Sequence, residues 1–223
     1  MTSTAAQLAR TEEERRYYAL EDRAWRVLAP VYDAIVFPLR RMRQRVARLA
    51  DVQPGMQVLD VATGTGAQAI AFADAGAEVT AVDLSAAMLR VARRKVGRRT
   101  IVFREGDARA LPFRSGSFDR AGISFGLHEM PPSVRREALR ELARVTKADG
   151  RVVIVDYALP RGRFARWVVY HVVKLYERDS YAEFVRSDLH AMLDEAGLIE
   201  VADDRPAIRW WSPVVVVIAR NRA

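Results

Sequence analysis

The 223-residue sequence predicts an α/β protein with seven strands, most of which alternate with helices. Two observations lead to this prediction. Five short apolar runs, each bounded by turn or polar residues, alternate with longer stretches of helix-forming composition. Two further apolar runs follow a last helix near the end of the chain. Such alternation is typical of a largely parallel sheet that helices cover on both faces.

Local signals mark the limits of the individual elements. Ser85 and Ser133 can cap the helices that follow them, and Gly76 and Gly197 suit the ends of two others. The predicted strands cover residues 58–60, 78–83, 100–103, 118–125, 151–156, 198–202 and 213–219. The predicted helices cover residues 40–49, 67–75, 85–96, 134–145, 164–178 and 188–196, and residues 5–28 also have a helical composition.

The segment from residue 58 to residue 83 has the order strand, glycine turn, helix, strand, terminal carboxylate. This order is typical of a nucleotide-binding βαβ unit. Gly64 and Gly66 let the backbone turn sharply and approach a ligand, and the helix that follows offers unpaired N–H groups. Asp83, 19 residues after Gly64, stands where a carboxylate can accept hydrogen bonds from ribose hydroxyls.

The glycine turn allows two interpretations. Residues 64–69 match the dinucleotide fingerprint G-x-G-x-x-G/A, which favours an NAD-linked enzyme. Asp60, however, lies close to the turn, and a carboxylate there suits a cationic ligand better than a pyrophosphate. The segment resembles motif I of the class I S-adenosylmethionine (SAM) methyltransferases, an acidic residue followed by G-x-G-x-G. Ala62 replaces the first glycine of that motif.

The resemblance covers about residues 30–220, and its four matches fall in the order and spacing of the family: the glycine turn, Asp83, Asp107, and LPF followed by GSFD at 111–119. It implies a Rossmann-like sheet that is parallel except for an antiparallel last strand. It also implies that Asp107 meets the adenine amino group and that the N–H of Ala108 donates to a ring nitrogen. SAM is then the expected cofactor. The expected cofactor-binding residues are Tyr32, Asp60, Ala62, Thr63, Gly64, Gly66, Asp83, Leu84, Met88, Asp107, Ala108, Ser124 and Phe125.

A cluster at the end of the fourth predicted strand, Ser124 to Met130, is the expected place of the chemistry, because ligands collect at the carboxyl ends of parallel strands. His128 is the one residue there that titrates near neutral pH, so we expect it to act as a general base. The alternative is that His128 packs against the following helix. Glu129 could orient it or recognise a cationic group.

The stretch from residue 123 to residue 157 is similar to the ubiquinone/menaquinone-biosynthesis C-methyltransferases and their relatives, which include bacterial phospholipid N-methyltransferases. In the quinone enzymes an Arg-Asn pair usually follows the Phe-Gly turn, and this chain has His128-Glu129 instead. The resemblance implies a small apolar or amphipathic methyl acceptor, either quinol/phenol-like or phospholipid-amine-like. The remaining alternatives are an NAD(P)-linked oxidoreductase and a nucleotide-binding regulator without catalysis.

Two segments are candidates for a helical cap around the site. Residues 1–55 precede the first strand, and we interpret them as an N-terminal helical cap segment in which Tyr32 lines either the pocket or the core. Residues 56–223 then form the SAM-binding core, with a cap insertion at about 160–187. This insertion is rich in aromatic residues, so it can form a wall of the acceptor pocket or pack against the N-terminal helices.

Composition excludes several classes of function. The chain has no cysteine, which excludes disulfides and thiolate sites, and its three scattered histidines do not predict a metal centre. No signal peptide or membrane span is evident, so we expect a cytoplasmic protein. The basic run from Arg90 to Arg104 lacks interleaved aromatic residues, so no specific nucleic-acid partner is expected despite the net charge of +8. The aromatic insertion leaves a peripheral contact with a membrane surface open, and nothing indicates an oligomeric state.

Overall fold

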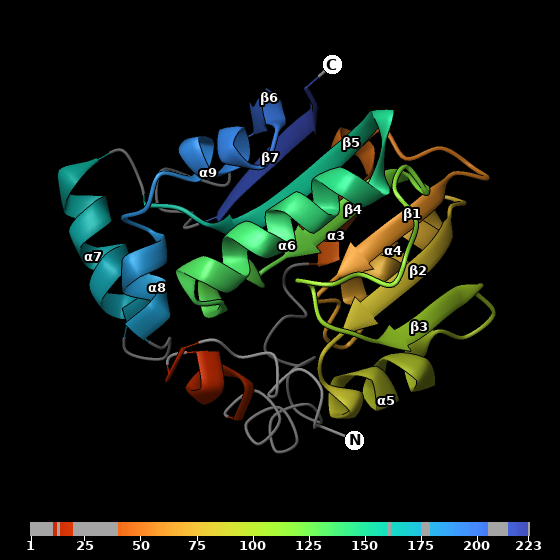
Figure 1. The fold of residues 1–223 in the computed structure, drawn as a ribbon, viewed down its shortest axis with the longest axis horizontal. Coiled ribbons are helices and arrows are strands. Elements are labelled where there is room, and N and C mark those ends of the chain that lie inside the picture. The colour runs from red at the N-terminus through yellow and green to blue at the C-terminus, as the bar shows by residue number, and fades with distance from the viewer. Residues whose placement is uncertain are drawn as a thin grey trace.

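The structure is a computed structural model that describes residues 11–12, 14–19, 40–159, 162–174, 179–204 and 214–222. Its centre is a seven-stranded sheet with the strand order β3-β2-β1-β4-β5-β7-β6 (Figure 1). The strands are β1 (Gln57–Val61), β2 (Glu78–Asp83), β3 (Ile101–Glu105), β4 (Phe118–Ser124), β5 (Thr146–Tyr157), β6 (Leu198–Asp204) and β7 (Val214–Asn221).

The pairing of the strands confirms the predicted sheet. β1 to β5 pair with one another in parallel, and β7 runs antiparallel to both of its neighbours, β5 and β6. The carboxyl ends of β1, β2, β3 and β4 therefore meet at one edge of the sheet. β5 begins five residues earlier than the apolar pattern predicts, because Thr146 already pairs with Phe118 before the register shifts.

Helices cover both faces of the sheet, as predicted. On one face α3 (Arg40–Leu49) and α4 (Ala67–Asp74) lie near α5 (Ala86–Lys95), and on the other lie α6 (Pro132–Val145) and α9 (Leu189–Glu195) (Figure 1). β5 supplies both cores in alternation: Val152 and Ile154 pack on the α6 side, and Val153 and Val155 on the α3 and α4 side. A strand buried on both faces reads as a continuous apolar run, which is why the sequence shows it clearly.

The capping predictions have mixed outcomes. The Ser85 hydroxyl accepts the Met88 N–H at 3.3 Å, so the predicted cap of α5 is confirmed. The prediction that Ser133 caps α6 is wrong, because α6 begins at Pro132, two residues earlier than predicted, and Pro131 is its N-terminal flanking residue. The Ser133 hydroxyl instead donates to Glu14, which belongs to a helical segment at residues 14–19.

The proposed cap segments are described in part. α7 (Arg163–Lys174) covers most of the predicted helix 164–178, residues 175–178 lie outside the described residues, and α8 (Asp179–Phe184) follows. In the N-terminal segment α3 joins the core through Val46 and Ala47, whereas residues 20–39 lie outside the described part. Within the described residues, the structure contains no helix with the length and apolar character that a membrane crossing requires.

Candidate active site

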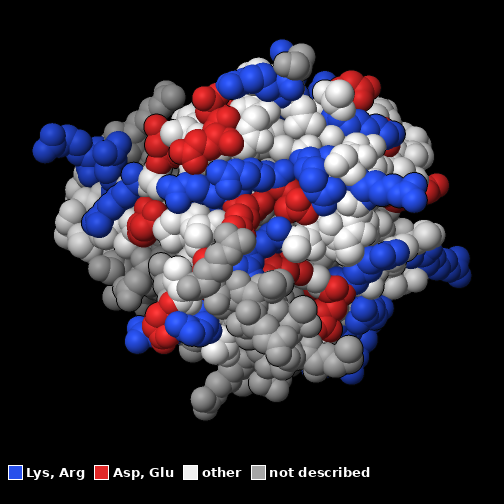
Figure 2. Space-filling model, in the orientation of Figure 1, with Lys and Arg blue, Asp and Glu red and all other residues white. Residues whose placement is uncertain are grey.

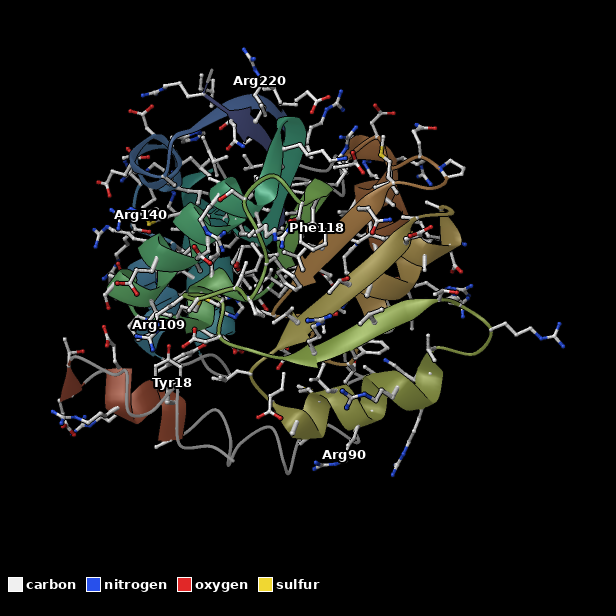
Figure 3. The ribbon with its side chains drawn as sticks, turned by 45° about the vertical axis from the view of Figure 1, so that its right-hand side comes forward. Tyr18, Arg90, Arg109, Phe118, Arg140 and Arg220 are labelled. Carbon is white, nitrogen blue, oxygen red and sulfur yellow. The ribbon has the colours of Figure 1, made fainter. Side chains whose placement is uncertain are left out.

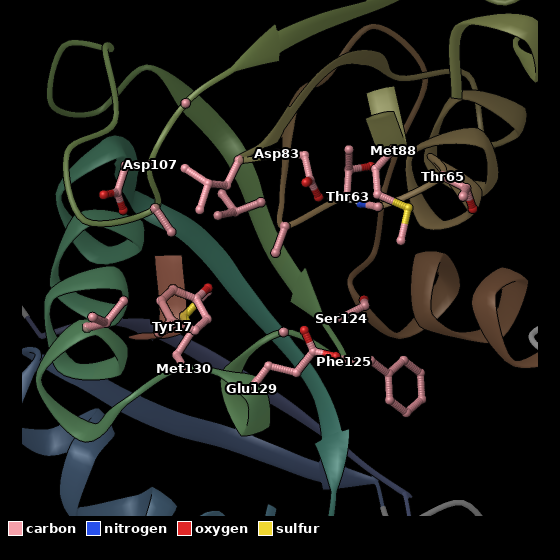
Figure 4. A pocket seen from close by; sticks show the side chains of 18 of the residues that line it. Tyr17, Thr63, Thr65, Asp83, Met88, Asp107, Ser124, Phe125, Glu129 and Met130 are labelled. Carbon is pink, nitrogen blue, oxygen red and sulfur yellow. Dashed lines mark hydrogen bonds between the residues drawn. The ribbon is translucent and has the colours of Figure 1, made fainter. Parts of the chain in front are cut away.

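A cleft opens at the carboxyl ends of β1 to β4 and encloses about 850 Å³ when its mouth is included. Figure 4 shows Asp83 and Asp107 on one side of the cleft and Glu129 and Phe125 on the other. Ten of the predicted cofactor residues line it: Ala62, Thr63, Gly64, Asp83, Leu84, Met88, Asp107, Ala108, Ser124 and Phe125.

Three other predicted residues lie close to the cleft without lining it. They are Asp60, Gly66 and His128, and Tyr32 lies outside the described residues. The sequence reasoning missed several lining residues, some of which adjoin the predicted residues and some of which come from other segments of the chain. The missed residues are Tyr17, Tyr18, Arg43, Val61, Thr65, Ala67, Gly106, Gly126, Glu129, Met130 and Val134. For Glu129 the signal was present, since it lies inside the cluster that follows β4.

The turn after β1 has a left-handed backbone at three residues, Ala62 (φ 52°), Gly64 (φ 56°) and Gly66 (φ 77°). Gly64 and Gly66 adopt this conformation at little cost, but Ala62 is strained. Gly126 makes room for the Ala62 methyl group, because a Cβ on Gly126 would stand 2.9 Å from the Ala62 Cβ. The alanine that replaces the usual motif glycine is therefore accommodated by a glycine on the loop after β4.

Asp60 lies below this turn and is almost completely buried. Its Oδ2 accepts the Thr63 hydroxyl at 2.5 Å, which ties the end of β1 to the turn. Burial raises the pKa of Asp60 to about 7, although the Thr63 hydrogen bond and the charge of Arg43 act in the opposite direction. A nearby cation would favour the ionised form of this carboxyl group.

Asp83 stands at the end of β2 and organises the backbone around the cleft. Its two oxygens accept the N–H groups of Gly64 at 2.6 Å and of Ser85 at 2.8 Å. Burial raises the pKa of Asp83 to about 6, and these two hydrogen bonds oppose the shift. A carboxylate has about four acceptor positions, so each oxygen can still accept one hydroxyl from a ligand.

Asp107 is held by the N-terminal segment as well as by its own loop, through Tyr18 and Arg109, which lie close together in Figure 3. Its Oδ2 accepts the Tyr18 hydroxyl at 3.0 Å, and Arg109 forms an ion pair with it at 3.0 Å while lying over the Tyr18 ring. Burial and the charge of Asp107 raise the pKa of Tyr18 above its ordinary value, so this hydroxyl remains a donor. Glu14, also buried, contacts Arg109 at 3.5 Å. Tyr17 and Tyr18 thus line one side of the cleft, and Glu14 supports them through Arg109.

His128 lies in the short 3₁₀ helix η2 (Leu127–Glu129) and is buried. Its Nδ1 is 2.7 Å from Oδ1 of Asp156, a fully buried residue near the end of β5. Its Nε2 lies 3.9 Å from the Glu129 carboxylate, which lines the cleft. The rings of Tyr157 and Phe184 flank the imidazole at 4.7 and 6.4 Å between centroids. Asp156, and not Glu129, is therefore the residue that is hydrogen-bonded to Nδ1.

Comparisons with known proteins agree with this geometry. A family model described as "Methyltransferase domain" matches residues 58–150, from β1 into β5. A demethylmenaquinone methyltransferase from Thermobifida fusca (strain YX) is 35% identical over 199 residues, which cover 82% of this chain and 83% of that protein. The chain belongs to this family of SAM-dependent methyltransferases. The assignment decides between the NAD and SAM interpretations of the glycine turn in favour of SAM.

A second relative is matched over less of its own length than the one from Thermobifida fusca. A demethylmenaquinone methyltransferase from Paenarthrobacter aurescens (strain TC1) is 41% identical over 170 residues, or 74% of this chain. This chain spans only 61% of that relative's length. Among solved structures, the magnesium protoporphyrin IX methyltransferase from Synechocystis PCC 6803, with bound SAH, has a TM-score of 0.61 at 18% identity. That match covers 96% of this chain and 89% of the other, and it shows a common fold.

The residues of the cleft fit SAM. Among the described residues, no atom outside the turn itself lies within 4 Å of the position that a Cβ on Gly64 would occupy, so the turn is open to a ligand that approaches the backbone. Asp83 and Asp107 are acceptors, and the ribose hydroxyls and adenine amino group of SAM are donors. Burial raises the pKa values of Asp60 and Asp83 and so favours their neutral forms, and a sulfonium cation bound nearby would favour the ionised carboxylates instead.

Proposed function

We propose that this chain transfers the methyl group of SAM to a quinol-like apolar acceptor, with His128 as the general base and Asp156 as the residue that orients it. The observation that carries the proposal is the buried imidazole–carboxylate pair, 2.7 Å apart, on the turn that borders the cofactor cleft. In such a pair the carboxylate accepts the Nδ1–H and leaves the Nε2 lone pair to receive a proton. The names of the relatives, demethylmenaquinone methyltransferases, support a quinone-type acceptor.

SAM, when bound, supplies an electrophilic methyl group on a sulfonium sulfur. In the proposed mechanism the residues of the chain align the acceptor, exclude water and accept a proton. Nε2 of His128 would accept the proton of the acceptor's ring hydroxyl, which makes the neighbouring ring carbon nucleophilic toward the methyl group that bound SAM would supply. The methylated carbon would then release its own proton to solvent, and the imidazolium would return its proton to the oxygen, so that the ring regains its aromatic form. Asp156 stabilises the imidazolium that forms, and its own N–H partners keep it in place: the backbone N–H groups of Leu127 and Tyr157 donate to it at 3.0 and 2.7 Å.

The aromatic surroundings of His128 support a planar apolar acceptor over a phospholipid amine. Tyr157 and Phe184 flank the imidazole, and Phe125 of the cleft packs against Tyr157 at 5.6 Å between centroids. A quinol ring can pack against such side chains. An amine that binds in its neutral form would have no need of the His128–Asp156 pair.

The test is a methyl-transfer assay with purified protein, labelled SAM and four acceptors: a reduced demethylated naphthoquinol, a simple phenol, an alkylamine and phosphatidylethanolamine. We expect labelled product from the naphthoquinol, and we expect His128→Gln to lose it. Methylation of phosphatidylethanolamine alone would refute the proposed acceptor. SAM binding without transfer to any acceptor would favour a regulator without catalysis.

We also propose that α7 brings this methyltransferase to the cytoplasmic surface of an anionic membrane, where apolar acceptors are found. Phe164 and Trp167, one turn apart on α7, are 73% and 62% exposed. Arg163 and Arg166 are exposed beside them, and Figure 2 shows Lys and Arg side chains at the edge of the molecule over α7. Exposed aromatic residues flanked by arginines are typical of a helix that lies in the headgroup region of an anionic bilayer.

Sedimentation with lipid vesicles tests this contact. We expect the protein to bind vesicles that contain phosphatidylglycerol, and to bind pure phosphatidylcholine vesicles less well. The double variant Phe164→Ser/Trp167→Ser should lose binding, whereas Val102→Ser, which removes an exposed apolar side chain on β3, should not. Equal binding of the two variants would refute the role of α7.

A further inference from the structure

The turn that carries His128 is held at its amide end and at its carbonyl end by two buried charged residues. Asp156 Oδ2 accepts the backbone N–H groups of Leu127 at 3.0 Å and of His128 at 3.3 Å. From the other side, Arg135 of α6 donates through Nε to the Leu127 carbonyl at 3.0 Å and through Nη2 to the Met130 carbonyl at 2.9 Å. A 3₁₀ helix of three residues has little stability of its own, so these bonds determine where it lies.

Burying the charged side chain of Arg135 at this position costs free energy. Its side chain is 0% exposed, and within the described residues its Nη1 has no hydrogen-bond partner. A buried guanidinium often stabilises a protein no better than apolar residues of the same volume would. What an apolar residue cannot supply is the pair of directed bonds to the Leu127 and Met130 carbonyls. These bonds make Arg135 suited to fixing the geometry of η2.

Arg135 also contacts α8, which lies in the predicted cap insertion. The charge of Arg135 is paired with Glu183 of α8, at 2.9 Å between Nη2 and Oε2. The neighbouring Phe184 packs its ring under the guanidinium at 4.8 Å and lies 6.4 Å from the His128 ring. α8 thus contacts both the base and the residue that holds the turn of the base.

We propose that Arg135 is a positioning residue for His128, and that its ion pair with Glu183 makes the placement of the imidazole depend on the docking of α8. The inference rests on the proposed role of His128 as the base. When α8 is docked, the Glu183 carboxylate neutralises the charge of the buried guanidinium and keeps its N–H groups directed at the Leu127 and Met130 carbonyls. When α8 moves away, the guanidinium loses its counter-charge and the two bonds to η2 weaken, so His128 leaves its position beside Asp156.

The main test is Glu183→Gln, because the Glu183 side chain is 46% exposed and the variant keeps the shape of the residue. The imidazole ¹⁵N resonances of His128 report its tautomer and its bond to Asp156, and they require neither SAM nor an acceptor. The chain has three histidines, so loss of one signal set in His128→Gln assigns them. We expect the His128 resonances to shift in Glu183→Gln, and kcat to fall about tenfold to a hundredfold, with SAM affinity unchanged.

The matched control is Glu195→Gln, which breaks the neighbouring surface pair between Arg136 of α6 and Glu195 of α9, 3.3 Å apart. It should change neither the His128 resonances nor kcat. A second variant, Arg135→Lys, keeps the charge but cannot span both carbonyls, and it should shift the same resonances. Unchanged His128 resonances in Glu183→Gln, or an equal shift in Glu195→Gln, would overturn the proposal. If the wild-type protein methylates no quinol while the resonances shift as expected, the positioning role of Arg135 and Glu183 is supported and the proposed acceptor is refuted.

Discussion

Replacing Asp83 by asparagine is the most direct test of how the cleft holds its cofactor. The change keeps the size of the side chain but turns one carboxylate oxygen into an amide nitrogen. Because both oxygens accept backbone N–H groups, from Gly64 and Ser85, the new NH₂ group faces a donor on one side. The variant also loses the charge that strengthens any hydrogen bond from a ribose hydroxyl.

The expected loss follows from these contacts. A hydrogen bond that involves a charged group contributes about 1.5–3 kcal/mol, which corresponds to a loss of SAM affinity of about tenfold to 150-fold. The pH dependence has a definite sign. Burial raises the pKa of Asp83 to about 6, so its carboxylate is present above pH 6 and is lost as the pH falls through 6. If only the ionised form binds, the wild-type affinity should drop about tenfold between pH 7 and pH 5.

Isothermal titration calorimetry with SAM between pH 5 and pH 7.5 measures both effects. The control is Asp119→Asn, because Asp119 also accepts a backbone N–H, from Gln57 at 2.8 Å, but at the opposite edge of the sheet. The ion pair with Lys147 lowers the pKa of Asp119, so it does not titrate in this range. The reasoning is refuted if folded Asp83→Asn binds SAM as tightly as the wild type, or keeps the same fall in affinity toward pH 5.

Three further predictions concern the base, the strained turn and the cap. His128→Ala and His128→Gln should slow transfer to a quinol or phenol about a hundredfold to ten-thousandfold without changing SAM affinity, with partial recovery at higher pH; full activity of the folded variants would show that His128 only packs. Ala62→Gly should stabilise the protein by up to about 1 kcal/mol in urea denaturation, since relief of a left-handed alanine (about 1–2 kcal/mol) exceeds the entropic cost of glycine (about 0.5–1 kcal/mol). Gly126→Ala should be destabilising in the wild type and less so in Ala62→Gly, because the 2.9 Å contact is then absent and only the 3.3 Å contacts with the Ile123 side chain remain. Hydrogen exchange of residues 14–19 and 163–184 should slow when SAM or its demethylated product binds, and equal exchange in both states would leave these segments as plain scaffold.

The sequence alone determined the sheet and the cofactor edge, because both are encoded locally. A parallel strand buried on both faces requires a continuous apolar run, as in 152–155, and each such run is visible without knowledge of its neighbours. The glycine turn, Asp83 and Asp107 each follow a strand directly, so their place at one sheet edge follows from the order of elements. Ten of the predicted cofactor residues do line the cleft.

Only the tertiary structure decided which residues complete the site. Asp156 is 28 residues from His128, Tyr18 is 89 residues from Asp107, and Glu183 is paired with Arg135 from a separate helix. No local pattern encodes such pairs, because they form where the packing of the sheet brings distant segments together. The sequence suggested Glu129 as the partner of His128 because it is adjacent. The fold places the buried Asp156 carboxylate next to Nδ1 instead, because β4 and β5 are neighbouring parallel strands whose carboxyl ends meet.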